Sequence, residues 1–329
     1  MQPFEYSRAK ETSAAIKSLT SHARAKFVAG GTNLLDLMKE HVETPDRLVD
    51  VNELPLSAIE SVAGGVRIGA LNRMSATAAH ETIRTNFPAI SEALLLSASP
   101  QLRNMASIGG NLMQRTRCPY FRDITFEACN KRNPGSGCSA IDGENRMHAI
   151  LGTSDSCIAT HPSDLAVALA AFDAVVHVRG PKGDREIAAK DFHLLPGSTP
   201  HREHALALDE IITAVFVPSA AHARTSHYLK VRDRASYEFA LTSAAVGLGL
   251  DGRTIRSSRI ALGGVGTKPW RSMEAESVLI GKTVSTDVFR AAAEAALRGA
   301  KAQRQNGFKI ELARNTIVRA LETVSGRTA

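Results

Sequence analysis

The sequence predicts an α+β protein with more than one domain, and three observations support this. The chain has 329 residues, which is longer than a single hydrophobic core usually serves. Its N-terminal part has a strand–helix–strand pattern. Beyond about residue 224, three strands come first and three helices follow. Strands and helices that are segregated into blocks are typical of α+β units.

The strand–helix–strand pattern rests on three short apolar stretches. "AKFVAGG" is a strand that ends in two glycines, "NLLDLMKEH" has its leucines at helical spacing, and "DRLVDVNEL" is a second strand. A hairpin is expected in "AIESVAGGVRIGAL", because Gly64-Gly65 favours a tight turn. Helical patterns then cover residues 75–85 and 88–98.

The second half of the chain gives the remaining elements. "SDLAVALAAF" is a helix, and "AVVHVRG" and "DEIITAVFVP" are strands. The C-terminal strands are "TSHYLKVRD", "FALTSAAVGLGL" and "RTIRSSRIALGGV", and helices are expected near 271–281, 285–302 and 309–324. A domain boundary is therefore expected at 218–224, just after Pro218.

Composition excludes several classes of protein. Hydrophobic residues make up 43% and charged residues 22%, as in ordinary soluble globular proteins. Aromatic residues are only 5%, which argues against a stacking platform for nucleic acid. The formal charge is +7 with scattered Lys and Arg, which indicates a generally basic surface or a docking face for an acidic partner subunit.

No membrane span or signal peptide is expected. No window approaches the roughly 18 apolar residues that a span requires. The start, "MQPFEYSRAKETSAAIKSL", lacks a basic segment followed by an apolar one. A cytoplasmic protein with reduced thiols is therefore expected, unless the folded chain is exported with a partner.

Two glycine pairs have the chemistry of phosphate-binding loops. In "AGGTNLL", residues 30–33 lie between a strand and a helix, where glycines permit close approach and the helix start has unpaired N–H groups. Thr32 or Asn33 can cap that helix. In "RNMASIGGNLMQ", residues 109–111 can form an anion-binding nest. Each can also be an ordinary tight turn. Neither has Walker or Rossmann spacing, so a nucleotide would be held by another fold.

The stretch "THPSDLAVAL" places His161 and Asp164 at the start of a helix. Asp164 is either an ordinary acidic residue of a first helical turn or a contact to a ligand. His161 is either a structural histidine or a base. The sequence leaves both alternatives open.

All four cysteines lie in one irregular, glycine-rich segment, at Cys118, Cys129, Cys138 and Cys157. The spacing contains no CxxC pair, so it matches neither the common zinc nor the common ferredoxin pattern. Spacing alone leaves an iron–sulfur cluster, a zinc site and coincidence open. Thiolate ligands bind iron–sulfur clusters and zinc in preference to hard cations. A metal centre would also explain how so long a loop is held in place.

Taken together, several stretches resemble the FAD-binding subunits of the molybdenum hydroxylases, which include xanthine dehydrogenase, carbon monoxide dehydrogenase and aldehyde oxidoreductases. These stretches are "FVAGGTNLLDLMK", "ASIGGNLMQ", "PSDLAVALAAFDAVV", "YLKVRDRASYEFALTSAAV" and "IALGGVGTKPWR". The resemblance implies a vanillyl-alcohol-oxidase-type FAD-binding domain over 1–220, with a small subdomain at 1–55. It also implies a C-terminal domain over 221–329, built from a three-stranded antiparallel sheet and helices.

The resemblance also implies roles for individual residues. Two loops would hold the FAD pyrophosphate through backbone N–H groups, and their residues are Val28, Ala29, Gly30, Gly31, Thr32, Asn33 and Leu34, and Ser107, Ile108, Gly109, Gly110 and Asn111. Asp164 matches an acid that contacts FAD, and Ile212 matches an apolar residue at the flavin. Lys230 matches a lysine whose charge stabilises reduced flavin. FAD is expected to bind non-covalently, and no residue of this chain is expected to transfer protons catalytically.

The cysteine segment, residues 112–158, is an insertion relative to most of the family. It resembles the insertion in the FAD subunits of three-subunit periplasmic aldehyde oxidoreductases, and the β subunit of 4-hydroxybenzoyl-CoA reductase carries a comparable one. By that resemblance the four cysteines ligate a [4Fe-4S] cluster. The cluster can act as an electron relay or as a structural staple.

The implied function is electron transfer within a heterotrimer. A large partner subunit would oxidise an aldehyde at a molybdopterin centre, and a small partner would carry [2Fe-2S] clusters. This chain would pass the electrons to an external acceptor, either in the periplasm by co-export with a partner or in the cytoplasm. The alternatives are a molybdenum hydroxylase for xanthine, carbon monoxide or aromatic acyl-CoA, a stand-alone FAD oxidase, and a zinc-stapled binding protein.

Overall fold

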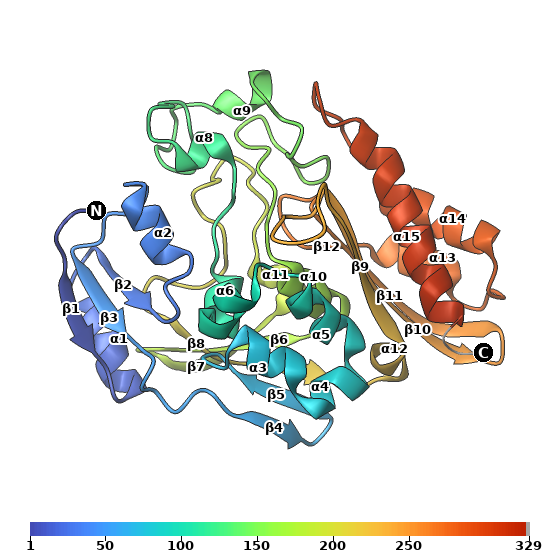
Figure 1. The fold of residues 1–329 in the computed structure, drawn as a ribbon, viewed down its shortest axis with the longest axis horizontal. Helices are drawn as coiled ribbons and strands as arrows, with labels where there is room; N and C mark the ends of the chain where they lie inside the picture. The colour runs from blue at the N-terminus through green and yellow to red at the C-terminus, as the bar shows by residue number, and fades with distance from the viewer. Residues whose placement is uncertain (327–329) are drawn as a thin grey trace.

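The computed structural model describes residues 1–326 and contains three β-sheets that follow one another along the chain. Figure 1 shows the N-terminal sheet on the left, the central sheet below the middle, and the C-terminal sheet with its helices on the right. The cysteine segment lies at the top, between the two ends of the molecule. The predicted α+β architecture is confirmed.

The N-terminal sheet is parallel, with strand order β1-β3-β2. Its elements are β1 (Glu5–Arg8), α1 (Thr12–Thr20), β2 (Ala25–Val28), α2 (Leu34–Lys39) and β3 (Arg47–Asp50). The predicted strand–helix–strand unit is therefore β2-α2-β3, and β1 and α1 were not predicted. Parallel pairing places the ends of β2 and β3 at one edge, so the first glycine loop starts at that edge.

The central sheet is antiparallel, with strand order β4-β5-β8-β6-β7. Its strands are β4 (Ile59–Val62), β5 (Gly65–Gly69), β6 (Val175–Gly180), β7 (Gly183–Ala188) and β8 (Ile211–Pro218). The predicted hairpin at residues 64–65 is confirmed, and Gly64 has a φ of 80° in its turn. Strands β5 and β8 pair although they are far apart in the chain, so all the site segments between them are anchored to this sheet.

Helices cover this sheet and fill the core. They are α3 (Met74–Ala79), α4 (Glu81–Asn86), α5 (Pro88–Leu95), α6 (Pro100–Met105), α7 (Ile108–Leu112), α10 (Asp164–Ala171) and α11 (Ala189–Phe192). Every residue of α10 is buried. A helix that is apolar all round belongs in the interior, and α10 contacts α5, β10 and β11.

The C-terminal sheet is antiparallel, with strand order β12-β11-β10-β9. Its elements are α12 (Ala221–Arg224), β9 (Ser226–Val231), β10 (Thr242–Asp251), β11 (Thr254–Gly263), β12 (Trp270–Arg271), α13 (Met273–Leu279), α14 (Thr286–Ala296) and α15 (Phe308–Gly326). The three predicted strands and three helices are confirmed, and a fourth strand, β12, is added. Two residues are too few to show an alternating pattern, so the sequence could not reveal it. Residues 327–329 lie outside the described part of the chain.

The cysteine segment contains only two short helices, α8 (Pro119–Arg122) and α9 (Ser139–Asp142). It is tied to the C-terminal region, because the side chains of Asn145 and Gln305 each accept a hydrogen bond from the other residue's backbone N–H, at 3.0 and 2.7 Å. Leu37 of α2 packs into its apolar cluster. Within residues 1–326, no helix has the length and apolar character that crossing a membrane requires.

Candidate functional site

The first glycine loop, residues 29–33, connects β2 to α2. Gly31 has a φ of 71°, a conformation that favours glycine. At Gly30 an added Cβ would lie 2.0 Å from the carbonyl oxygen of Met105, so the loop can reach this position only without a side chain. The N–H groups of residues 30–33 have no acceptor within residues 1–326. Four consecutive donors are therefore open to a ligand.

Asn33 does not cap α2 with its side chain, so that interpretation of the sequence is wrong. Its Oδ1 instead accepts a hydrogen bond from the backbone N–H of Arg115, at 3.0 Å. The Arg115 guanidinium bonds Glu43 and Glu203, both at 2.5 Å. Arg115 thus links the first glycine loop to the segment that follows the second one.

The second glycine loop forms the start of α7 and is built differently. The N–H groups of Ile108 and Gly109 donate to the carbonyls of Asn72 and Ala70, at 3.0 and 2.8 Å. The Gly110 N–H donates to the Ser107 hydroxyl at 3.2 Å, and the N–H of residue 111 donates to the Ser107 carbonyl at 2.8 Å. All four donors of this loop therefore have acceptors within the protein, and they are not open like those of the first loop.

The second loop allows a ligand to approach its backbone closely. An added Cβ at Gly109 would meet Ala70 at 3.1 Å and the Ile212 Cβ at 3.6 Å, so this glycine faces the core, and Ile212 lies directly behind it. An added Cβ at Gly110 would meet only the Ser107 hydroxyl, at 2.9 Å. Gly110 is exposed, so its face is open to a ligand.

Asp164, the first residue of α10, is the centre of a buried polar network. It accepts hydrogen bonds from Ser97 at 3.0 Å, Tyr228 at 2.7 Å and Lys230 at 2.8 Å. The Lys230 side chain is 1% exposed and also donates to the Leu96 carbonyl at 3.1 Å. Burial and the Asp164 charge raise the pKa of Tyr228 well above 10, so its hydroxyl stays a donor. Asp164 is therefore not an ordinary surface acid, and Lys230 is paired rather than a lone cation.

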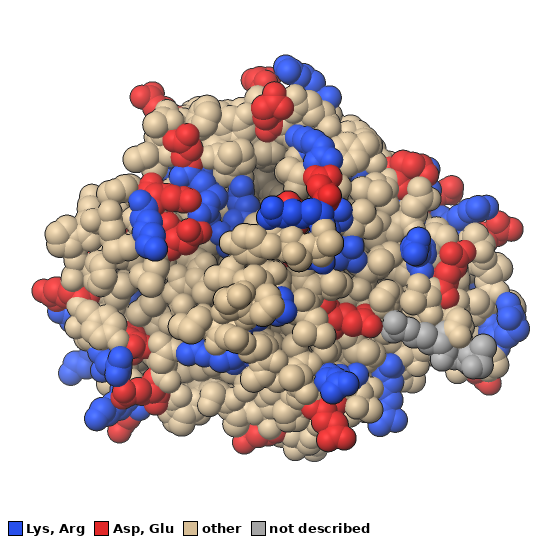
Figure 2. Space-filling model, viewed as in Figure 1, with Lys and Arg blue, Asp and Glu red and all other residues tan. Residues whose placement is uncertain are grey.

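A cavity of about 210 Å³ adjoins this network. Asp164, Cys118 and His148 line it, together with residues 238–240 of the loop between β9 and β10. Figure 2 shows the surface hollowed below the cysteine segment, with Lys and Arg side chains at the edge of the hollow. The cavity therefore brings residues of the cysteine segment beside the Asp164 network.

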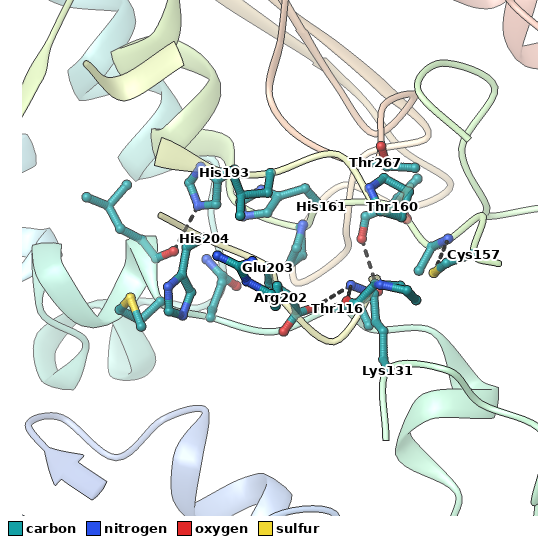
Figure 3. A pocket seen from close by; sticks show the side chains of 18 residues that line it. Thr116, Lys131, Cys157, Thr160, His161, His193, Arg202, Glu203, His204 and Thr267 are labelled. Atoms are coloured by element: carbon teal, nitrogen blue, oxygen red, sulfur yellow. Dashed lines mark hydrogen bonds and ion pairs between the residues drawn. The ribbon is translucent and has the colours of Figure 1, made fainter. Parts of the chain in front are cut away.

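His161 lies in the wall between this cavity and a second pocket, which Figure 3 shows. Its Nδ1 accepts from the Ser163 N–H at 3.3 Å, and its ring lies 4.1 Å from that of His193, centre to centre. Burial lowers the pKa of His161 well below 6.5, so the ring is neutral. These contacts favour the structural interpretation of His161 over the base.

The four cysteines lie in one apolar cluster, together with residues of α2, α8 and α9. They are free thiols, and three of them are buried while Cys138 is partly exposed. Cys129 and Cys138 face each other across a short antiparallel bridge, and the Cys138 and Cys157 side chains hydrogen-bond. Within residues 1–326, no three His, Cys, Asp or Glu side chains converge as one bound ion would require.

Backbone N–H groups surround the thiols. Burial raises the pKa of Cys118 to about 12, and the N–H groups of Phe121 and Tyr120 act in the opposite direction. The hydrogen bond with Cys157 lowers the pKa of Cys138 to about 6. The same pairing, together with burial, raises the pKa of Cys157 well above 9, so Cys138 is the thiol of this pair that is favoured as a thiolate.

Comparison with known proteins identifies the family. Residues 2–220 match the model of the FAD binding domain in molybdopterin dehydrogenase, and residues 227–324 match the CO dehydrogenase flavoprotein C-terminal domain. The chain belongs to this family of FAD-binding subunits. It is thus an oxidoreductase subunit, as the sequence predicted.

Individual relatives are similar over most of their length. The aldehyde oxidoreductase FAD-binding subunit PaoB of Escherichia coli is 49% identical over 323 residues, covering 98% of both chains. The glyceraldehyde dehydrogenase medium chain of Sulfolobus acidocaldarius is 28% identical and covers 87% of this chain and 84% of its own. Carbon monoxide dehydrogenase of Hydrogenophaga pseudoflava matches in structure, with a TM-score of 0.77, 25% identity and 99% and 98% coverage.

The residues of this FAD-binding subunit fit the cofactor. Four open N–H donors at residues 30–33 suit a pyrophosphate, and the uncovered face of Gly110 leaves room for it. The sequence did not reveal Arg115, Tyr228 or Lys309 as residues that hold the site together. Each of them has a partner 64 or more positions away in the chain, so no local pattern marks it.

Proposed function

We propose that this chain is the FAD- and [4Fe-4S]-containing electron-transfer subunit of a heterotrimeric, molybdenum-dependent aldehyde oxidoreductase. Its partners are a large subunit with the molybdenum cofactor and a small subunit with [2Fe-2S] clusters. The observation that carries the proposal is the gathering of all four cysteines in one buried cluster. Similarity over 98% of both chains to an aldehyde oxidoreductase subunit supports the choice of substrate.

The glycine loops and the Asp164 network divide the binding of FAD between them. Residues 28–34 hold the pyrophosphate through backbone N–H groups, and residues 107–111 approach it closely at Gly110. Asp164, Lys230 and Ile212 lie at the flavin end, where the paired charges orient the ring. When bound, FAD accepts electrons from the small partner and passes them to an external acceptor.

The cysteine segment holds the cluster through Cys118, Cys129, Cys138 and Cys157. A [4Fe-4S] cluster takes four thiolate ligands, and the chain has only these four cysteines. Their sulfurs share one largely buried apolar cluster, and the Cys138 thiol, whose pKa is lowered to about 6, is the one most readily deprotonated to a ligand. Zinc can also take four thiolate ligands, so metal analysis of the purified protein distinguishes the two centres.

The test is the composition and activity of the purified protein. The three-subunit complex should oxidise aldehydes, and this chain should contain one FAD and about four irons beyond those of its partners. Xanthine, carbon monoxide and aromatic acyl-CoA should be poor substrates. Zinc in place of iron would overturn the cluster. Aldehyde turnover by the isolated chain without molybdenum would overturn the role in a complex and favour a stand-alone oxidase.

A further inference from the structure

Within residues 1–326, His148 is the one non-cysteine side chain that hydrogen-bonds a cysteine sulfur. Its Nε2 lies 3.2 Å from the Sγ of Cys118. His148 belongs to the cysteine segment and is 3% exposed. Both residues also line the cavity beside the Asp164 network. The imidazole is thus a buried polar group aimed at one thiol.

The C-terminal region fixes His148 in this position. The His148 carbonyl accepts hydrogen bonds from Lys309 Nζ and Asn306 Nδ2, both at 3.1 Å. Lys309 is fully buried and also donates to the carbonyls of Met147 at 3.0 Å and Gly264 at 2.7 Å. The backbone at His148 is therefore clamped from a separate part of the fold, and the direction of the ring follows from it.

The chemistry of a metal-bound thiolate decides which atom donates. A thiolate that ligates iron has no proton, so it can only accept a hydrogen bond. The Nδ1 atom of His148 is buried and has no partner. A proton on Nδ1 would be an unsatisfied buried donor, whereas a proton on Nε2 has the sulfur as its acceptor. The Nε2–H tautomer is therefore favoured.

We propose that His148 is a positioning residue that donates its Nε2–H to the Cys118 thiolate and thereby raises the reduction potential of the cluster. This inference rests on the proposed function, because it requires the cluster to be present. Hydrogen bonds to the sulfurs are among the factors that set iron–sulfur potentials. A donor stabilises the more negative, reduced state more than the oxidised one, so the potential rises with it.

The test is a redox titration of the intact three-subunit complex, followed by electron paramagnetic resonance of the reduced cluster. His148→Phe keeps a ring of similar size without the N–H, and His148→Gln keeps an N–H donor. We expect full iron content in both variants. The potential should shift in the negative direction in His148→Phe and stay closer to the wild-type value in His148→Gln. An unchanged potential in His148→Phe, with iron retained, would overturn the inference.

Two further measurements keep the test decisive. Met147→Leu changes a neighbour that lines the same cavity without contacting a thiol, and it should leave the potential unchanged. If His148→Phe loses iron, pulsed resonance of the wild-type complex with ¹⁵N-histidine decides the question. A weak histidine nitrogen coupling supports the inference, and no coupling, or the strong coupling of a directly bound nitrogen, overturns it. Absence of the cluster from the wild-type complex would instead refute the proposed function.

Discussion

The two glycine loops look alike in sequence and differ in structure. Both place a Gly-Gly pair and an asparagine at the start of a helix. In the first loop, the N–H groups of residues 30–33 have no acceptor within residues 1–326. In the second loop, residues 108–111 donate to the carbonyls of Asn72, Ala70 and Ser107 and to the Ser107 hydroxyl. The first loop therefore leaves backbone N–H donors free for a ligand, whereas the second loop leaves free space beside its backbone.

The difference shows that a glycine pair has more than one physical use. Gly30 and Gly109 let the backbone pack against other backbone, at Met105 and Ala70. Gly31 adopts a positive φ, and Gly110 leaves space on the outer side of its helix. Each glycine should therefore respond differently to the same substitution, which makes the comparison testable.

The largest effect on FAD retention is expected for Gly30→Val. The new Cβ would lie 2.0 Å from the Met105 carbonyl, so the loop must move and its four donors move with it. Overpacking of this kind costs about 1–3 kcal/mol of stability. We expect both FAD content and the unfolding free energy to fall, as measured by flavin absorbance and urea denaturation. Full FAD retention would show that this loop is not the donor site.

Gly110→Val should lower FAD content while stability changes by less than about 1 kcal/mol, because valine is tolerated at least as well as glycine in a helix. The added side chain meets only the Ser107 hydroxyl within the protein, but it occupies the open face. Gly307→Val, at an exposed glycine where an added Cβ would meet only Ala302 at 3.7 Å, is a control for nonspecific effects. FAD content equal to that of wild type in Gly110→Val would remove the second loop from the binding site.

Glu203→Gln should loosen the link between the two loops. Burial disfavours the Glu203 charge, but Lys131 and Arg115 lower the pKa of Glu203 from 4.5 to about 2. A lowered acid pKa contributes stability above pH 4.5 and loses it as the pH falls through about 2. The variant should be less stable than wild type by about 2 kcal/mol near neutral pH, as for a charged hydrogen-bonded pair.

The same substitution gives a pH test with its own control. The stability difference between wild type and Glu203→Gln should shrink as the pH falls from about 6 to about 3, because Glu203 of the unfolded chain is protonated below about pH 4.5, while the folded protein keeps it charged down to about 2. Urea denaturation at the two pH values measures this difference. A difference that stays constant would mean that the carboxylate charge does not contribute.

Asn33→Ala should have the smallest effect. It removes the acceptor for the Arg115 N–H, and a single hydrogen bond contributes about 1 kcal/mol. Because Asn33 does not cap α2, helix content should be unchanged in circular dichroism, with only a slight loss of FAD affinity. A marked loss of helix would restore the capping interpretation.

Much of the fold followed from sequence because its elements have local signals. The three C-terminal strands and helices have regular apolar patterns, and the Gly64 turn has a strong hairpin signal. The strand β12 has only two residues, and β1 (EYSR) is polar and mostly exposed, so neither has an apolar pattern.

The candidate site could likewise be predicted only where the sequence carries a local signal. Cysteine identity and the glycine pairs marked the segments, but not which N–H groups remain open. That property depends on acceptors such as the carbonyls of Asn72 and Ala70, which packing brings near. The pairing of Lys230 with Asp164 was also hidden, because the residues belong to separate elements 66 positions apart. Long-range contacts of this kind depend on the tertiary structure rather than on local pattern.

Amide hydrogen exchange with and without FAD, measured by mass spectrometry on the three-subunit complex, tests the role of the first loop most directly. FAD should slow exchange in the peptide that contains residues 28–34, because its open N–H groups gain acceptors. The peptide with residues 107–111 should exchange slowly in both states, because its N–H groups already donate to the protein. The reverse result, with FAD protecting residues 107–111 and leaving residues 28–34 unchanged, would contradict the assignment of the first loop as the pyrophosphate site.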